Sequence, residues 1–246
     1  MNDSHSAISP GWPTRWPKDS FTGFWTWFIA GFIALLFVAA FIGGVKTTRV
    51  PAVTPVEFDI LIGLQFVLEG ILVAIVLLVL PALSKLSLRE LGFRMPGRGQ
   101  LGTALIGAIA MAVVANGGAT LIDYLFHSQH QQDIVEIFKT LHDRSTIVIF
   151  AVFAIVFAPF AEETLFRVFF FNLGLRYWGF WGGAVLSGVL FGMAHGDLYA
   201  LIPLALGGMV LCAVYYRTRN AWMSMLSHAL FNTLSIVALL FGPKVS

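Results

Sequence analysis

The stretch "PFAEETLFRVFFF", residues 159–171, places two adjacent glutamates and one arginine inside a long apolar run. One ionised side chain at the centre of a membrane helix costs roughly 2.5 to 3.5 kcal/mol on insertion scales. Charged residues that are kept at such positions therefore tend to serve a function. The stretch predicts a functional centre built on Glu162, Glu163 and Arg167 within a membrane-spanning helix.

The composition of the whole chain indicates an integral membrane protein. Hydrophobic residues occupy 58% of the 246 positions and charged residues 11%, and the mean hydropathy is +0.83. Ordinary soluble domains carry about 25% charged residues. The net charge of +2 and the lack of a basic run interleaved with aromatic residues argue against nucleic-acid binding. The single cysteine, Cys212, excludes a disulfide framework within the chain.

Seven apolar runs match or approach the length of a transmembrane helix. We expect an all-α, polytopic bundle of about seven to eight spans, forming one domain over residues 24–246 after a polar N-terminal tail over residues 1–23. The first run is too long for the apolar core of a cleaved signal peptide. The chemistry-bearing core is expected at about residues 147–241. The runs cover roughly 24–44, 60–83, 101–126, 147–172, 180–195, 198–216 and 220–241.

Basic residues predict the orientation of the bundle. The link over residues 84–100 is the densest basic stretch of the chain, and basic links favour the cytoplasmic side. This places the N-terminus inside, in a multi-pass protein of the cytoplasmic membrane. The basic residues of this link are Lys85, Arg89, Arg94 and Arg98.

Helical spacing assigns different roles to the two glutamates. Glu163 and Arg167 are four residues apart with the acid first, the favoured order for an ion pair on one helix. Glu162 lies about 100° around the helix from Glu163 and can face a cavity unpaired. An unpaired carboxylate in a medium of low dielectric is a candidate general base.

Two later apolar runs carry the other polar candidates. His195 occurs in "LFGMAHGD", with Phe191 one turn earlier. His228 and Asn232 in "SHALFNT" share one helix face at i,i+4 spacing. At 1.5 Å per residue, Glu162, His195 and His228 lie on the order of 15, 22 and 12 Å from the cytoplasmic ends of their helices. These depths allow one shared pocket, in which a carboxylate, two imidazoles and one amide would form a hydrolytic site.

Three sequence motifs together resemble those of a known family. "EETLFR" matches E-E-x-x-x-R, "FGMAH" matches F-x-x-x-H, and "HALFN" matches H-x-x-x-N. In this order and spacing they resemble the CAAX prenyl protease and bacteriocin-processing family of intramembrane endopeptidases, also called the Abi family. The resemblance covers about residues 150–240. Val168 departs from the glycine that many relatives have after the arginine, which alters helix packing and removes no catalytic group.

The resemblance implies roles for the polar residues. Glu162, helped by His195, would activate a water molecule, and His228 with Asn232 would stabilise the oxyanion. The implied reaction is hydrolysis of a peptide bond in a membrane-anchored protein or peptide within the bilayer. The residues implied to support the site are Glu163, Arg167 and Phe191.

The sequence does not decide whether the site binds a metal ion. Glu162, His195 and His228 are candidate ligands for a divalent metal such as zinc, with one coordination position open. The chain has no H-E-x-x-H motif, and the three candidates lie in three separate runs.

Two other classes of function also remain open. The chain could be a non-catalytic membrane protein with a bacteriocin-immunity or scaffold role, in which the charged residues form a structural ion-pair cluster. It could also be a small ion-coupled or proton-coupled transporter, although the inverted repeats typical of that class are not visible. Gln65 and Glu69, another i,i+4 pair in an apolar run, are expected to be structural or to line the cavity.

Overall fold

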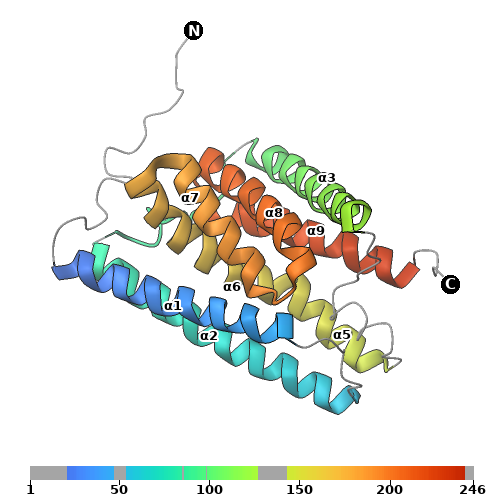
Figure 1. The fold of residues 1–246 in the computed structure, drawn as a ribbon. Coiled ribbons are helices and arrows are strands. Elements are labelled where there is room, and N and C mark those ends of the chain that lie inside the picture. The colour runs from blue at the N-terminus through green and yellow to red at the C-terminus, as the bar shows by residue number, and fades with distance from the viewer. Residues whose placement is uncertain (1–20, 47–53, 85, 98, 127–142, 242–246) are drawn as a thin grey trace, which may run out of the picture.

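The computed structural model describes residues 21–46, 54–84, 86–97, 99–126 and 143–241 (Figure 1). Every regular element in these ranges is a helix, which confirms the all-α class. The expected N-terminal tail lies outside the described residues up to residue 20. The elements are α1 (Phe21–Lys46), α2 (Pro55–Ser84), α3 (Gln100–Phe126), α5 (Arg144–Val152), the π-helix η1 (Phe153–Phe157), α6 (Ala158–Glu163), the π-helix η2 (Thr164–Phe171), α7 (Asn172–Ala194), α8 (Leu198–Thr218) and α9 (Ala221–Phe241).

Within the described ranges, six helical stretches are long and apolar enough to cross a membrane. A helix suits this environment because it satisfies its backbone hydrogen bonds internally, where lipid offers no partners. The expected runs 147–172 and 180–195 belong to one continuous stretch of 51 residues, Arg144–Ala194, which is counted once among these six. The chain is thus a polytopic helical membrane protein.

The stretch of 51 residues reverses its direction at Gly179. This residue has φ 70° and ψ −171°, a conformation for which glycine is suited because it lacks a Cβ atom. The backbones on either side of the turn then meet closely, since a Cβ atom added to Gly174 would lie 2.5 Å from the Cα of Gly183. The fold-back is visible in the α7 ribbon of Figure 1. It explains why the sequence showed two separate apolar runs here.

The π-helical turn η1 leaves one backbone carbonyl without a partner in its own helix. The N–H of Ala158 donates to the carbonyl of Phe153, five residues back. Residue 159 is proline and has no N–H to donate. The carbonyl of Ala154 therefore lacks both the i+4 and the i+5 donor, so it can accept a hydrogen bond from another helix. Such π-helical turns occur frequently at functional sites.

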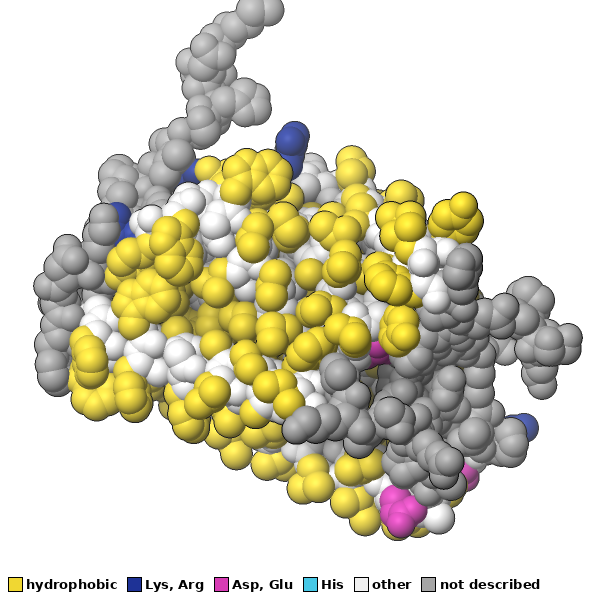
Figure 2. Space-filling view, viewed as in Figure 1, with side chains coloured by type: hydrophobic (Ala, Val, Ile, Leu, Met, Phe, Trp, Pro, Cys, Tyr) yellow, Lys and Arg dark blue, Asp and Glu magenta, His cyan; other side chains and the backbone are white. Residues whose placement is uncertain are grey.

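The middle of the long stretch forms the core of the bundle, while the outer faces are apolar. All residues of η2 are buried. In Figure 1, α1 and α2 lie along one side of this segment, and α3, α8 and α9 lie on the other. Large hydrophobic side chains cover the face seen in Figure 2. The exposed large hydrophobic residues of the described chain include Phe28, Leu78 and Ile106. Apolar side chains at this density suit a surface that faces lipid.

Glycines on α7 allow α8 to pack closely against it. A Cβ atom added to Gly188 would lie 2.5 Å from the carbonyl oxygen of Ala205, and one added to Gly192 would lie 2.5 Å from that of Leu201. In both cases the obstacle is backbone, which cannot rotate away as a side chain can.

Gly188→Ala is expected to lower the free energy of unfolding by about 1–3 kcal/mol, because the added methyl group forces α7 and α8 apart. The measurement is thermal unfolding of the purified protein in detergent. Gly63→Ala on α2 is the matched control, since nothing lies within 4 Å of a Cβ atom added there. A Gly188→Ala protein that unfolds at the wild-type temperature would contradict the close packing.

Candidate active site

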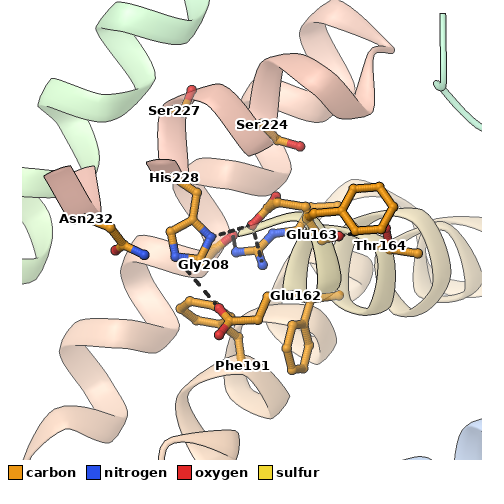
Figure 3. Close-up of polar contacts among 12 residues, drawn as sticks. Glu162, Glu163, Thr164, Phe191, Gly208, Ser224, Ser227, His228 and Asn232 are labelled. Carbon is orange, nitrogen blue, oxygen red and sulfur yellow. Dashed lines mark hydrogen bonds and ion pairs between the residues drawn. The ribbon is translucent and has the colours of Figure 1, made fainter. Parts of the chain in front are cut away.

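Glu163 lies buried between a guanidinium group and an imidazole ring. Nη1 of Arg167 and Nδ1 of His228 each lie 3.0 Å from Oε1 of Glu163 (Figure 3). Nη2 of Arg167 also donates to the carbonyl of Gly208 on α8, at 3.1 Å. The side chains of Glu163 and Arg167 are both 0% exposed. The ion pair expected from the spacing is present, and it extends through His228 to α9.

Phe191 on α7 links this charged group to both histidines. Its ring centroid lies 4.6 Å from the guanidinium carbon of Arg167, within range of a cation–π interaction. The same ring lies 4.9 Å from the ring of His195 and 5.6 Å from that of His228. A Cβ atom added to Gly208 would lie 3.2 Å from both Arg167 and Phe191, so glycine there lets the backbone of α8 approach the guanidinium.

Glu162 is the glutamate without a close partner. Its Oε2 lies 3.7 Å from Nε2 of His228, and its side chain is 18% exposed. Within the described part of the chain, this oxygen has no hydrogen-bond partner. The separation of 3.7 Å exceeds the usual N–H···O hydrogen-bond distance. The two groups therefore do not use each other as hydrogen-bond partners, and each can still bond to a water molecule.

In each histidine, the contact made by Nδ1 leaves Nε2 as the ring nitrogen that can contact water or a substrate. Nδ1 of His228 lies beside the carboxylate of Glu163, and Nδ1 of His195 lies 2.8 Å from the carbonyl oxygen of Phe191. Both oxygens act as acceptors, so Nδ1 donates in each ring. In the neutral imidazole, Nε2 is then the unprotonated nitrogen. The Nε2 of His228 is the one that faces Glu162.

His195 sits at the C-terminal end of α7 and is exposed. It contacts the Phe191 ring, but among the described residues it forms no hydrogen bond or ion pair with Glu162 or His228. The structure places His228 next to Glu162, and the predicted action of His195 on the water stays a prediction.

Asn232 on α9 is held by the free carbonyl of η1. Its Nδ2 donates to the carbonyl oxygen of Ala154 at 2.7 Å. Because Pro159 has no N–H, this carbonyl has no competing donor from its own helix. An amide carries two N–H groups, so one fixes the side chain and the other remains available. The contact was not predicted from the sequence, although a proline in an apolar helical run, here Pro159, indicates that a backbone carbonyl lacks its donor.

The metal set suggested by the sequence is not assembled. In the parts of the chain that the structure describes, no three His, Cys, Asp or Glu side chains are grouped so that they could hold a metal ion. Protein zinc sites generally need at least three such ligands. Glu162, His195 and His228 are not grouped in this way.

An open apolar pocket is lined by residues of the two helices that carry Glu162 and His228. It has a volume of about 490 Å³ and lies between the η1–α6 segment and α9. It reaches Ala229, the neighbour of His228, and Phe160, two residues before Glu162. The other lining residues are Ile155, Val156, Phe157, Pro159, Trp222, Met225 and Leu226.

Comparison with known proteins relates this region to peptidases. Residues 144–234 match the family model described as type II CAAX prenyl endopeptidase Rce1-like. The chain is also 25% identical, over 171 residues, to YdiL of Bacillus subtilis (strain 168), a protein named as a candidate membrane peptidase. That alignment covers 66% of each chain, so this chain spans about two thirds of the relative's length. No solved structure matches the chain.

Proposed function

Because residues 144–234 match the Rce1-like CAAX endopeptidase family model and the chain carries the three sequence motifs, we propose that this chain is an intramembrane endopeptidase. It hydrolyses a peptide bond of a membrane-anchored protein or peptide. The observation that carries the proposal is the position of Glu162, an unpaired carboxylate 3.7 Å from an imidazole nitrogen inside an apolar bundle. A carboxylate in this setting suits general-base catalysis.

In the proposed reaction, Glu162 takes a proton from a water molecule held between its carboxylate and Nε2 of His228. The water oxygen attacks the carbonyl carbon of the scissile peptide bond, and a tetrahedral oxyanion forms. Glu162 then returns the proton to the amide nitrogen as the C–N bond breaks. The proton that Glu162 takes from water is the one that it returns to the amide nitrogen, so the reaction consumes only water.

The remaining polar groups are proposed to stabilise the oxyanion and to orient the histidine rings. The second N–H of Asn232 is a donor held in place before substrate arrives, since its partner N–H is bonded to Ala154. Glu163, whose charge is balanced by Arg167, contacts Nδ1 of His228 and orients the ring so that Nε2 faces the proposed reaction site. We assign to the Nε2 of His195 a supporting role toward the water or the substrate.

The apolar pocket is the proposed approach for the substrate. It is open on one side and its lining is almost wholly apolar, so it suits a hydrophobic segment that enters sideways from the bilayer. Its lining includes Phe160 and Ala229, on the helices that carry Glu162 and His228, so we propose that a segment seated there extends to these two residues.

We further propose seven crossings, counting the two arms on either side of Gly179 separately. The basic link over residues 84–100 and the N-terminus are proposed to lie in the cytoplasm, because basic links favour that side. Labelling of single cysteines from either side of the membrane tests this orientation.

Asn232→Ala is expected to lower kcat by about 10²–10³-fold, the usual loss for one oxyanion donor. The measurement is cleavage of a quenched fluorescent peptide that carries a hydrophobic anchor. Ser235→Ala is the control, because Ser235 lies on the same helix, is exposed and donates to the carbonyl of Phe231 in its own helix. If Asn232→Ala cleaves as fast as Ser235→Ala, Asn232 does not stabilise the oxyanion.

The function as a whole is tested by comparing membrane fractions from cells that carry the wild-type protein or Glu162→Gln. A membrane-anchored precursor is expected to accumulate in the variant, with its shorter product missing. Identical membrane proteomes would count against a protease. In that case, ion flux in proteoliposomes that Glu162→Gln abolishes would identify a transporter instead.

A further inference from the structure

The link between α2 and α3 is folded against the junction of α8 and α9, and its described part includes residues 86–97. Nη2 of Arg94 and Nε2 of Gln100 both donate to the carbonyl oxygen of Thr218, at 3.1 and 3.0 Å. Nδ2 of Asn220 donates in turn to the carbonyl oxygen of Arg94 at 3.0 Å. These hydrogen bonds hold the link at one end of the bundle.

Four arginines lie at this junction, and we call them the arginine cluster. Thr218 stands directly between two of them in the chain, and a third donates to its carbonyl oxygen. The fourth begins the turn of the link that ends at Gly92, whose carbonyl oxygen accepts from the N–H of Ala221 at 2.9 Å. The cluster consists of Arg89, Arg94, Arg217 and Arg219, and the first three are exposed.

Among the described residues, the positive charge of the cluster exceeds the negative charge beside it. Arg89, Arg94 and Arg217 form no ion pair with a carboxylate in this part of the chain. Glu90 is the acidic residue of the link, and its Oε2 accepts from the N–H and the hydroxyl of Ser87 at 2.9 and 2.8 Å. The guanidinium groups can therefore bind an anion from outside the chain.

The helix α9 runs antiparallel to the segment from α5 to α6. Near the start of α9, Trp222 stacks with Phe160 of α6, with 6.1 Å between the ring centroids. Further along α9, Asn232 bonds to Ala154, which precedes Phe160 in the chain. The start of α5 at Arg144 therefore lies at the end of the bundle opposite the arginine cluster.

Carboxylates lie at that opposite end. Oδ2 of Asp59 on α2 and Oδ2 of Asp143 before α5 lie 3.3 and 3.1 Å from the hydroxyl oxygen of Thr146. Glu57, two residues before Asp59, is exposed. Among the described residues, charge is thus separated along the bundle, with an excess of cations at one end and of carboxylates at the other. An anionic partner is attracted to the arginine cluster by this distribution.

Exposed apolar side chains stand beside the arginines. Leu88 and Met95 each neighbour an arginine of the cluster in the chain, and they are 43% and 90% exposed. Trp222 is 43% exposed and packs edge-on against Phe93 of the link, with ring centroids 5.8 Å apart. Basic and apolar side chains together with tryptophan are typical of a surface at the membrane interface. This composition favours a lipid over a free anion, because the apolar side chains would otherwise face water.

We propose that the arginine cluster binds the headgroup of an anionic phospholipid. Its guanidinium groups donate to the phosphate oxygens, and Leu88 and Met95 contact the acyl chains. A lipid with a net negative charge is preferred to a zwitterionic one, whose own cation is repelled by the cluster. The bound lipid joins the link to α8 and so stabilises the fold. This binding involves neither Glu162 nor His228 and does not depend on the proposed hydrolysis.

Native mass spectrometry of the purified protein provides the first test, in detergent micelles with equal amounts of phosphatidylglycerol and phosphatidylcholine. The wild type is expected to retain phosphatidylglycerol preferentially. The double variant Arg89→Gln with Arg217→Gln is expected to bind it about 25-fold more weakly, since each basic residue contributes about fivefold at an anionic membrane surface. Neither side chain has a hydrogen-bond partner among the described residues, so the contacts of Arg94 remain. Arg144→Gln, the control at the opposite end of the bundle, is expected to bind like the wild type.

Thermal unfolding in detergent provides the second test. Without added lipid, the double variant and the wild type are expected to unfold at the same temperature, which shows that the variant is folded. Added phosphatidylglycerol is expected to raise the unfolding temperature of the wild type and to raise that of the double variant much less. Inorganic phosphate alone is expected to raise neither. Stabilisation of the wild type by phosphate alone to the same extent would overturn the lipid and identify a site for free phosphate.

Salt provides a test on the wild type alone, which holds even if the double variant is unstable. Raising the ionic strength from about 0.1 to about 1 M shortens the screening length from about 10 to about 3 Å, and it is expected to reduce the preference for phosphatidylglycerol. Three results would each overturn the proposal: a preference that salt does not change, equal retention of the two lipids by the wild type, or equal binding by the wild type and a folded double variant.

Discussion

Glu162→Gln is expected to lower kcat by about 10²–10⁴-fold, the contribution typical of a general base, and to leave the fold intact. Glutamine has nearly the same shape as glutamate but does not accept a proton from water at neutral pH. The substituted group has no hydrogen bond to lose at Oε2 and is partly exposed, so the free energy of unfolding should change little. The measurement is single-turnover cleavage of the anchored peptide, together with thermal unfolding in detergent.

Asp143→Asn is the matched control for this charge removal. Asp143 caps the first turn of α5 at the exposed end of the same helical stretch, where its carboxylate accepts from the backbone N–H of Thr146. Asparagine caps helices about as well as aspartate does. Asp143→Asn should therefore cleave at the wild-type rate. Equal rates in Glu162→Gln and Asp143→Asn would show that Glu162 is not the base.

Arg167→Met is expected to destabilise the protein by about 3–5 kcal/mol, the largest effect on stability that we predict. Methionine approximates the length of the aliphatic part of arginine, but it leaves Glu163 buried at 0% exposure without its cation. It also removes the donor to the carbonyl of Gly208. The loss would appear as a lower unfolding temperature in detergent and a smaller yield of monodisperse protein.

The double variant Arg167→Met with Glu163→Gln shows whether the loss of stability comes from the unpaired charge of Glu163 or from the lost contacts of the guanidinium. It leaves no unpaired charge in the core, and the amide oxygen of glutamine can still accept from Nδ1 of His228. Much of the stability lost in Arg167→Met should return. A double variant no more stable than the single one would mean that packing of the guanidinium, for instance against Phe191, accounts for the effect.

The parts of the site that could be predicted from the sequence are those within one helix. The i,i+4 spacing identified Glu163 as the partner of Arg167 and Glu162 as the unpaired acid, because neighbours on one helix surface follow from helical geometry. The position of His228 between the two glutamates depends on how α9 packs on α6. The depths along the helices allowed either histidine to lie near Glu162. Depth alone does not show which faces of two helices contact each other.

The same distinction applies to the fold. Composition and apolar runs were enough to predict an all-α bundle, but they did not reveal that two runs form one stretch turning at Gly179. Glycine is frequent in this chain, and the turn is specified by the close backbone contact of Gly174 with Gly183, a tertiary feature. Likewise, Pro159 was visible, but the partner of the carbonyl that it frees lies on α9.

The pairing of Glu163 with Arg167 inside one segment bears on how the protein is made. A segment that leaves the ribosome with acid and base one helical turn apart carries its own counter-ion into the lipid, so the cost of inserting an isolated charge is reduced from the start. The carbonyl of Gly208 and the ring of His228 belong to helices synthesised later. Insertion of this segment can therefore precede completion of the site, and the later helices need only dock onto a segment that is already in place.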